Sequence, residues 1–213
     1  NDKMTQVDAE NDIISAFKIA EKAKLKTAYY ELNISCPNLF GNVSFYPPQN
    51  LENLLLKIAK LKIKKPIFIK MPISKSDKEV LEMLQVIIKF PIAGVIFGNT
   101  QNNRNDKSFV KEELNKYPLG NFSGKPTWER SNQLIKIAYI KYGKKLTIIG
   151  CGGIFSAQDA YIKIKLGASL VQLITGLVFE GPQLVSQINL ELPKLLKKDG
   201  FSHVKEAIGI SVT

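Results

Sequence analysis

Residues 29–38 read Tyr29-Tyr30-Glu31-Leu32-Asn33-Ile34-Ser35-Cys36-Pro37-Asn38. The first part of this segment belongs to an apolar, β-rich run, 28–34, which predicts a buried strand. The second part places two asparagines around a cysteine, in a turn that Pro37 fixes. A buried strand that ends in a polar loop is typical of an α/β protein.

The same alternation continues along the sequence. Apolar runs that predict strands alternate with amphipathic stretches that predict helices, which is the pattern of repeated βα units with a parallel sheet. The predicted strands are 28–34, 66–71, 94–97, 146–149 and 170–174. The predicted helices are 8–24, 50–62, 127–142 and 182–197, with two more that begin at capping-box patterns at Ser76 and Ser156, and with Gly143 and Gly167 as C-terminal stops.

Every polar or glycine-rich cluster of interest follows one of these strands. The clusters are 35–42, 72–75, 99–105, 151–153 and 175–176. Functional residues lie at the carboxyl ends of the strands both in open α/β sheets and in (β/α)8 barrels. Periodicity alone does not distinguish the two, but both predict a single site at this edge.

The residue types in these loops suit the recognition of a planar heterocycle. Asparagine side chains both donate and accept hydrogen bonds, as do the edges of a pyrimidine ring. The thiol of Cys36 is suited to act as a general base, because its ordinary pKa needs only a modest shift to operate near neutrality. Taken alone, Cys36 fits a buried structural cysteine equally well, and Asn99-Thr100 fits an ordinary turn.

Two further clusters point to a cofactor. Lys70 ends an otherwise apolar strand, where a lysine needs a partner or a function; the alternative is that it is simply the first exposed residue after the strand. The Gly152-Gly153 turn opens the helix that begins near Ser156, and free N–H groups at a helix start bind phosphate. Thr175-Gly176 is placed to complete that site, while Cys151 reads as a small packed residue.

In this order, the loops resemble those of dihydroorotate dehydrogenases, which are flavin mononucleotide (FMN) enzymes built on a (β/α)8 TIM barrel. Segment 33–38 resembles the active-site loop of that family, 69–72 its flavin lysine and 98–100 its third substrate-contacting strand. Segment 120–126 resembles its glycine-rich flavin loop, and the stretch from 167 to 182 its final strand and helix.

The resemblance implies a role for each matching position in the oxidation of dihydroorotate to orotate, a step of pyrimidine biosynthesis. Cys36 would remove the proton from C5 while hydride passes from C6 to the flavin N5. Substrate contacts would come from Asn33, Asn38, Asn99 and Thr100. Flavin and phosphate contacts would come from Asn33, Lys70, Asn99, Gly120, Ser123, Gly124, Gly152, Gly153, Thr175 and Gly176.

The sequence departs from the family pattern in two ways. Cys36 is the base of the soluble branch, whereas segments 123–126 and 167–172 resemble the quinone-using branch, so quinone, fumarate and NAD with a partner subunit all remain open as electron acceptors. The strands correspond to the fourth through eighth of the barrel. We therefore expect 1–213 to form one flavin-binding domain of about five βα units that lacks the N-terminal units. Such a chain would be a fragment, pair with a complementary chain, form a homo-oligomer, or have lost catalysis.

Composition limits the remaining choices. The chain has 213 residues with a formal net charge of +11, and its lysines are spread over helix faces with little aromatic interleaving, so we expect no nucleic-acid partner. Two cysteines and one histidine predict neither a disulfide framework nor a metal site. The polar start predicts a cytoplasmic protein, membrane-associated if missing N-terminal residues carry membrane helices.

Two other functions stay open. A flavin-dependent tRNA dihydrouridine synthase also ends a strand with asparagine before a Cys-Pro loop, and the positive charge suits it. The second asparagine, Asn38, and the 123–126 loop favour dihydroorotate dehydrogenase instead. A non-catalytic barrel subunit is the third reading, and it rests on the missing strands alone.

Overall fold

The structure is a computed structural model that describes residues 4–24, 26–35 and 43–212. It contains one parallel sheet of five strands in the order β1-β2-β3-β4-β5. The strands are β1 (Tyr30–Asn33), β2 (Ile67–Met71), β3 (Gly94–Phe97), β4 (Thr147–Cys151) and β5 (Leu170–Gln172). All five lie within or next to the apolar runs that predicted them, so the α/β fold of repeated βα units is confirmed.

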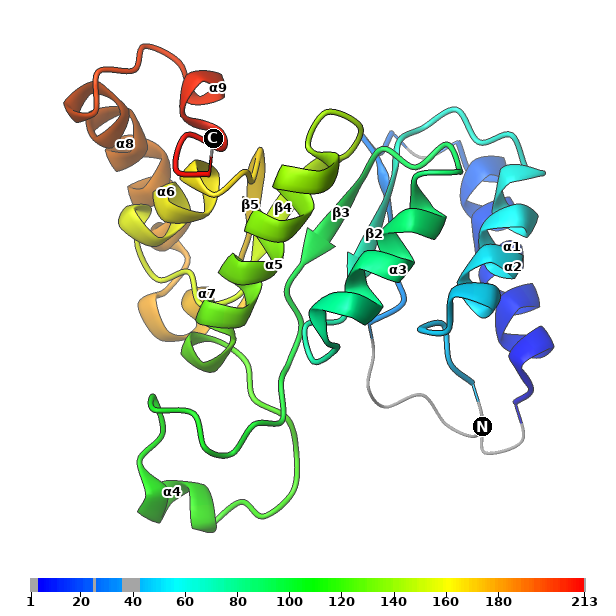
Figure 1. Cartoon of the computed structure of the whole chain (residues 1–213), viewed down its shortest axis with the longest axis horizontal. Coiled ribbons are helices and arrows are strands. Elements are labelled where there is room, and N and C mark those ends of the chain that lie inside the picture. The colour runs from blue at the N-terminus through cyan, green and yellow to red at the C-terminus, as the bar shows by residue number, and fades with distance from the viewer. Residues whose placement is uncertain (1–3, 25, 36–42, 213) are drawn as a thin grey trace.

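Helices cover the outer face of the sheet. Figure 1 shows α3 and α5 in front of the strands, α1 and α2 on one side, and α6 and α8 on the other. The longer helices are α1 (Gln6–Lys22), α2 (Pro48–Ala59), α3 (Asp77–Ile87), α5 (Trp128–Tyr142), α6 (Ala157–Lys165) and α8 (Gln183–Lys198). The short ones are α4 (Lys111–Asn115), the 3-10 turn η1 (Lys125–Thr127), α7 (Thr175–Glu180) and α9 (Val204–Ala207), none of which the sequence pattern predicted.

The predicted helix starts are only partly as expected. Ser76 begins α3 with a complete capping box, in which its hydroxyl and the Glu79 carboxylate each accept from the other's backbone N–H. Ser156 caps α6 through the N–H of Asp159, but the Asp159 carboxylate accepts from the N–H of Phe155. The second box is therefore a serine cap whose acidic partner bonds the residue before the cap and not the cap residue itself.

The two faces of the sheet bury different residues. Alternate strand residues such as Ile69, Val95 and Ile148 pack beneath the helices in the main core. Their neighbours Phe68, Ile96 and Ile149 form a separate apolar cluster on the other, concave face. Because strand side chains alternate, the polar residues Glu31 and Lys70 also face inward, above this apolar floor.

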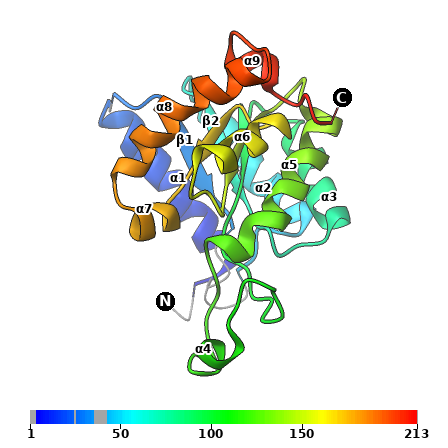
Figure 2. The same ribbon diagram turned by 90° about the vertical axis from the view of Figure 1, so that its left-hand side faces the viewer.

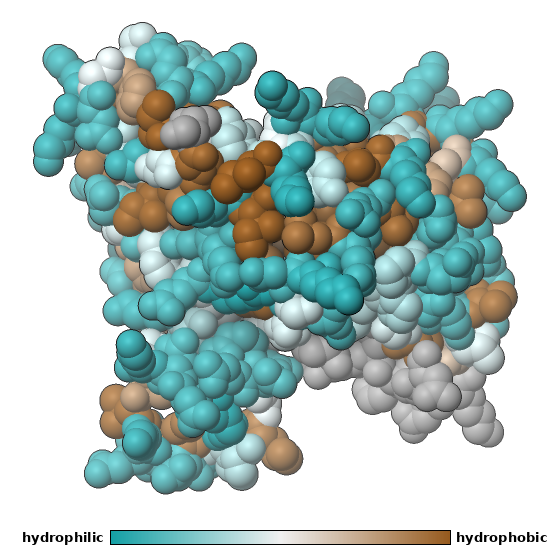
Figure 3. Space-filling view, viewed as in Figure 1, coloured by the Kyte–Doolittle hydropathy of each residue, from teal (hydrophilic) through white to brown (hydrophobic). Residues whose placement is uncertain are grey.

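Beyond β3, the chain makes an excursion away from the sheet. Residues 102–121 project from the body of the molecule in both views, and α4 lies at the tip (Figure 1, Figure 2). An isolated bridge between Gln101 and Phe122 closes the base of this excursion. Its tip exposes apolar side chains, including Val110, Tyr117 and Leu119, and Figure 3 shows apolar atoms on this segment.

Strands β1 and β5 are the edges of the described sheet, as predicted for five consecutive units. The surface beside β5 is apolar and open, with Leu170, Ile174, Val178 and Phe179 each more than half exposed. No helix in the described part of the chain is both long enough and apolar enough to cross a membrane.

Candidate functional site

A cavity of about 220 Å³ lies at the carboxyl ends of the strands. Its lining comes from the ends of β2, β3 and β4, from the segment before α5, and from the start of α7. The lining residues are Lys70, Gly98, Asn99, Thr100, Ser123, Gly124, Thr127, Cys151, Gly152, Gly153, Ile154, Leu173, Ile174, Thr175 and Gly176. Most of the residues that the sequence predicted for a flavin site therefore line one cavity.

The loop that leads to Cys36 is anchored to the end of β3. The side-chain amide of Asn99 donates to both the hydroxyl and the carbonyl of Ser35, each at 2.6 Å. Asn33 turns back at the end of β1, where its side-chain oxygen accepts from the N–H and the hydroxyl of Ser35. Asn33 and Asn99 thus meet at Ser35, and they fix the residue that directly precedes Cys36.

Close approach of backbone explains several of the glycines. Gly152 has a φ of +100°, and a Cβ there would lie 2.5 Å from the Thr127 hydroxyl oxygen. A Cβ on Gly176 would lie 2.2 Å from the carbonyl oxygen of Ile154. At these positions, only glycine lets the loops after β4 and β5 close on their neighbours and expose backbone to the cavity.

Hydroxyl groups tie the segment before α5 to the rest of the cavity wall. The hydroxyls of Thr175 and Ser123 are 3.0 Å apart and hydrogen-bonded. The buried Thr127 donates to the carbonyl of Gly124 at 2.7 Å. The segment before α5 and the loop after β5, which lie far apart in sequence, are therefore held against each other.

The expectation of a free helix end at α6 needs correction. The Asp159 carboxylate accepts from the N–H of Phe155 at 3.0 Å, and the N–H of Asp159 donates to the Ser156 hydroxyl at 3.1 Å. These groups at the start of α6 are already satisfied within the helix end. The glycine backbone at Gly152 and Gly153 remains the part of the predicted phosphate loop that lines the cavity.

The charged groups in the cavity are held in specific environments. Lys70 lies 3.6 Å from the Glu31 carboxylate, and both side chains are partly buried. Lys70 is thus an inward-facing, paired lysine and not simply the first exposed residue after β2. Burial raises the pKa of the Cys151 thiol, which fits the packed role predicted for Cys151 rather than a nucleophilic one.

A buried lysine behind the cavity was missed at the level of sequence. Lys163 on α6 is fully buried, and its ammonium donates to the side chains of Ser131 at 3.0 Å and Asn132 at 2.8 Å. It also lies 4.6 Å from the ring of Trp128. Ser131 bonds the carbonyl of Cys151 at 2.6 Å, so this cluster supports the end of β4 from outside. In a helix with other lysines, nothing in the pattern distinguishes Lys163 from a surface residue.

Four predicted residues are not placed at the cavity. Asn33 bonds Ser35 at the end of β1 but is not among the lining residues. Cys36 and Asn38 lie outside the described residues. Gly120 is exposed in the excursion beyond β3 and is not among the lining residues, and a Cβ there would meet nothing within 4 Å. Among the described residues, no three histidine, cysteine, aspartate or glutamate side chains gather as a metal site would require.

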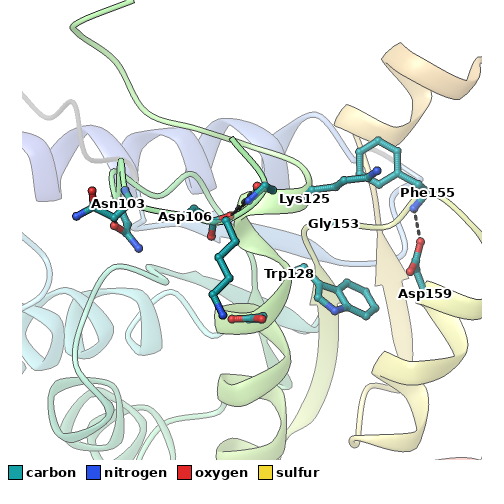
Figure 4. Close-up of a pocket in the computed structure, with 11 residues that line it drawn as sticks. Asn103, Asp106, Lys125, Trp128, Gly153, Phe155 and Asp159 are labelled. Atoms are coloured by element: carbon teal, nitrogen blue, oxygen red, sulfur yellow. Dashed lines mark hydrogen bonds between the residues drawn. The ribbon is translucent and has the colours of Figure 1, made fainter. Parts of the chain in front are cut away.

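A larger cavity of about 540 Å³ lies next to the first and is shown in Figure 4. It is formed between the excursion and the start of α5, and it shares Gly153 with the smaller cavity. Lys107 and Lys125 line it together with Asp106, Glu129 and Asp159. Its lining mixes both charges. Among the described residues predicted for the site, Gly153 is the one that also lines this larger cavity.

The chain is similar in sequence to known proteins. The family model for dihydroorotate dehydrogenase matches residues 3–196. A dihydroorotate dehydrogenase (quinone) from Trichodesmium erythraeum is 33% identical over 215 residues, covering 98% of this chain and 56% of the relative. One from Myxococcus xanthus is 36% identical over 185 residues, covering 85% of this chain and 50% of the relative. The chain thus spans about half the length of the curated relatives it matches.

Solved structures show the same fold. A ligand-free DHODH from Eimeria tenella superposes with a TM-score of 0.86 at 23% identity, covering all of this chain and 62% of that one. The DHODH of the same organism in complex with ferulenol gives a TM-score of 0.83 at 25% identity, covering 94% of this chain and 57% of that one. The described strands therefore form part of a TIM barrel.

Proposed function

Because the chain belongs to the dihydroorotate dehydrogenase family, we propose that it carries the catalytic part of an enzyme that oxidises dihydroorotate to orotate with FMN, a step of pyrimidine biosynthesis. The observation that carries the proposal is the cavity itself. It unites Lys70, Asn99 and the Gly152-Gly153 backbone beside a loop that leads to Cys36.

The residues that line the cavity fit a flavin nucleotide. Lys70 offers a donor and the side-chain oxygen of Asn99 offers an acceptor to the polar edge of the ring, and the glycine backbone and hydroxyls opposite offer donors to the phosphate. The cavity is smaller than the roughly 300–1,000 Å³ of most ligand sites, so these residues would enclose only part of FMN. We propose that about three further βα units, in the same polypeptide or a second chain, complete the barrel around it.

Each polar residue has a task in this reaction. FMN, when bound, supplies the hydride acceptor. Cys36 takes the proton from C5 of dihydroorotate, and Asn33 and Asn99 hold the loop that carries it through Ser35. Asn38 and Thr100 bind the pyrimidine and its carboxylate.

We further propose that the electron acceptor is a quinone. The curated relatives named above are dihydroorotate dehydrogenases (quinone). Cys36 would then serve as the base in an otherwise quinone-type site. Since quinones are lipid-soluble, the reaction would take place at a membrane surface.

Steady-state oxidation of dihydroorotate by the purified protein tests this function, with a short-chain quinone, fumarate and NAD as separate acceptors. We expect orotate to form with the quinone and not with the other two. Binding of transfer RNA that weakens steeply with salt, together with no orotate, would favour the dihydrouridine synthase reading instead.

A further inference from the structure

Three polar side chains form a layer on the concave face of the sheet, and each comes from a different strand. They are Glu31 from β1, Lys70 from β2 and Gln172 from β5. We propose that Glu31 is a positioning residue for Lys70, and that Gln172 holds Glu31 in place from the opposite edge strand. This inference rests on the proposed function, because Lys70 is the residue that would contact the flavin.

The Glu31 carboxylate uses its two oxygens for two different partners. Oε1 lies 3.6 Å from the Lys70 ammonium. Oε2 accepts from the side-chain amide of Gln172 at 3.0 Å, and the same amide lies 3.4 Å from the Tyr29 hydroxyl. A carboxylate held on both oxygens keeps a fixed orientation, so the ammonium that it faces has a fixed place as well.

Strand alternation explains why Glu31 faces inward. Its neighbour Tyr30 points to the outer face, where its hydroxyl donates to Glu21 of α1 at 2.7 Å. Glu31 therefore lies above the apolar floor formed by Phe68, Ile96 and Ile149. Above this floor, the Glu31 carboxylate has two partners, Lys70 and Gln172.

Lys70 faces both this layer and the cavity. It lines the cavity at the strand ends while its ammonium is paired with Glu31. A free lysine side chain loses up to about 2 kcal/mol of rotamer entropy on binding, and a lysine that is already held loses less.

The affinity for FMN, measured by quenching of flavin fluorescence, tests this role without turnover. We expect Glu31→Ala to weaken FMN binding about tenfold, because Lys70 is no longer pre-positioned. The matched control is Glu21→Ala, which removes the α1 carboxylate that bonds Tyr30 on the outer face of β1 and should leave the affinity unchanged. Gln172→Ala should weaken binding less, and should add little when combined with Glu31→Ala.

A double-mutant cycle separates positioning from a general structural effect. In a Lys70→Met background, Glu31→Ala should change the affinity for FMN less than twofold, since Glu31 then has no lysine to place. An equal loss in both backgrounds, or normal FMN binding by Glu31→Ala, would overturn the inference and leave the proposed function standing. No FMN binding by the unchanged protein would overturn both.

Discussion

The side-chain amide of Asn99 donates to both the carbonyl and the hydroxyl of Ser35, joining the end of β3 to the residue before Cys36 across the intervening strand β2. Two hydrogen bonds of 2.6 Å from one amide make this the direct link between the cavity wall and the loop that carries the proposed base. Asn99 thus holds the residue that precedes Cys36.

Asn99→Asp should lower kcat/KM for dihydroorotate. A carboxylate cannot donate to the Ser35 carbonyl, and leaving that group unpaired costs about 1–3 kcal/mol, roughly a fivefold to hundredfold loss. The comparison variant is Asn102→Asp, which makes the same change at an exposed position of the same loop. Equal kcat/KM values for the two variants would mean that the hydrogen bonds from Asn99 to Ser35 do not contribute to the reaction.

Gly152→Ala should weaken FMN binding by at least about tenfold more than Gly120→Ala. The two glycines have similar φ angles, +100° and +109°, so the backbone strain of the substitution is matched. Only at Gly152 would the new methyl group meet a neighbour, 2.5 Å from the Thr127 hydroxyl oxygen. Fluorescence titration with FMN measures the difference, and equal affinities would mean that Gly152 does not form the cavity wall.

Lys163 should make stability depend on pH above neutrality. Burial lowers the pKa of Lys163 from 10.5 to about 7, although the charges of Cys151 and Asp159 oppose this shift. Between those two pH values the unfolded chain binds a proton that the native chain does not, so the native state gains stability as the pH rises. Below about pH 7 both states carry the proton, and the cost of burying the charge is fully present.

Denaturant unfolding of the protein and of Lys163→Met at pH 6 to 9 measures this gain. We expect the unchanged protein to gain relative to the variant by about 1.4 kcal/mol for each unit above pH 7, as an upper bound. The exposed Lys136→Met on α5 should follow the unchanged protein at every pH. Parallel curves for the protein and Lys163→Met would contradict the lowered pKa.

Ser76→Ala should lower the free energy of unfolding by about 1 kcal/mol, because the Ser76 hydroxyl caps α3. The nearby exposed Ser74→Ala serves as the control in thermal unfolding. Hydrogen bonds from the backbone and the hydroxyl of Ser76, and then from Lys75, lower the pKa of Glu79 from 4.5 to about 2. The contribution of the Glu79 carboxylate to the cap is therefore lost as the pH falls through that range. The difference in the free energy of unfolding between the unchanged protein and Ser76→Ala should become smaller there.

The sequence predicted the strands well because each is a short apolar run with a distinct end. It also predicted Lys70, Asn99 and the glycines after β4, since the carboxyl ends of parallel strands meet at one edge whatever the details of packing. These positions depend on the order of elements, which periodicity reveals.

The parts that the sequence did not predict depend on tertiary contacts. Nothing local marks Glu31 as the partner of Gln172, which lies across the concave face and far along the chain. Lys163 looks like a surface lysine until α5 covers it. Gly120 lies in a glycine-containing segment that resembles a flavin loop, yet only Ser123 and Gly124 of that segment reach the cavity.

We propose that this chain holds the flavin and the base for dihydroorotate oxidation. Anaerobic mixing of the FMN-loaded protein with dihydroorotate, followed at the flavin absorbance band, tests it in a single turnover. We predict that the flavin is reduced, and that Cys36→Ala binds FMN normally but reduces it about a hundredfold or more slowly, as expected for loss of a general base. A protein that binds no FMN would contradict the proposal. Reduction of the flavin at an unchanged rate in Cys36→Ala would contradict it as well.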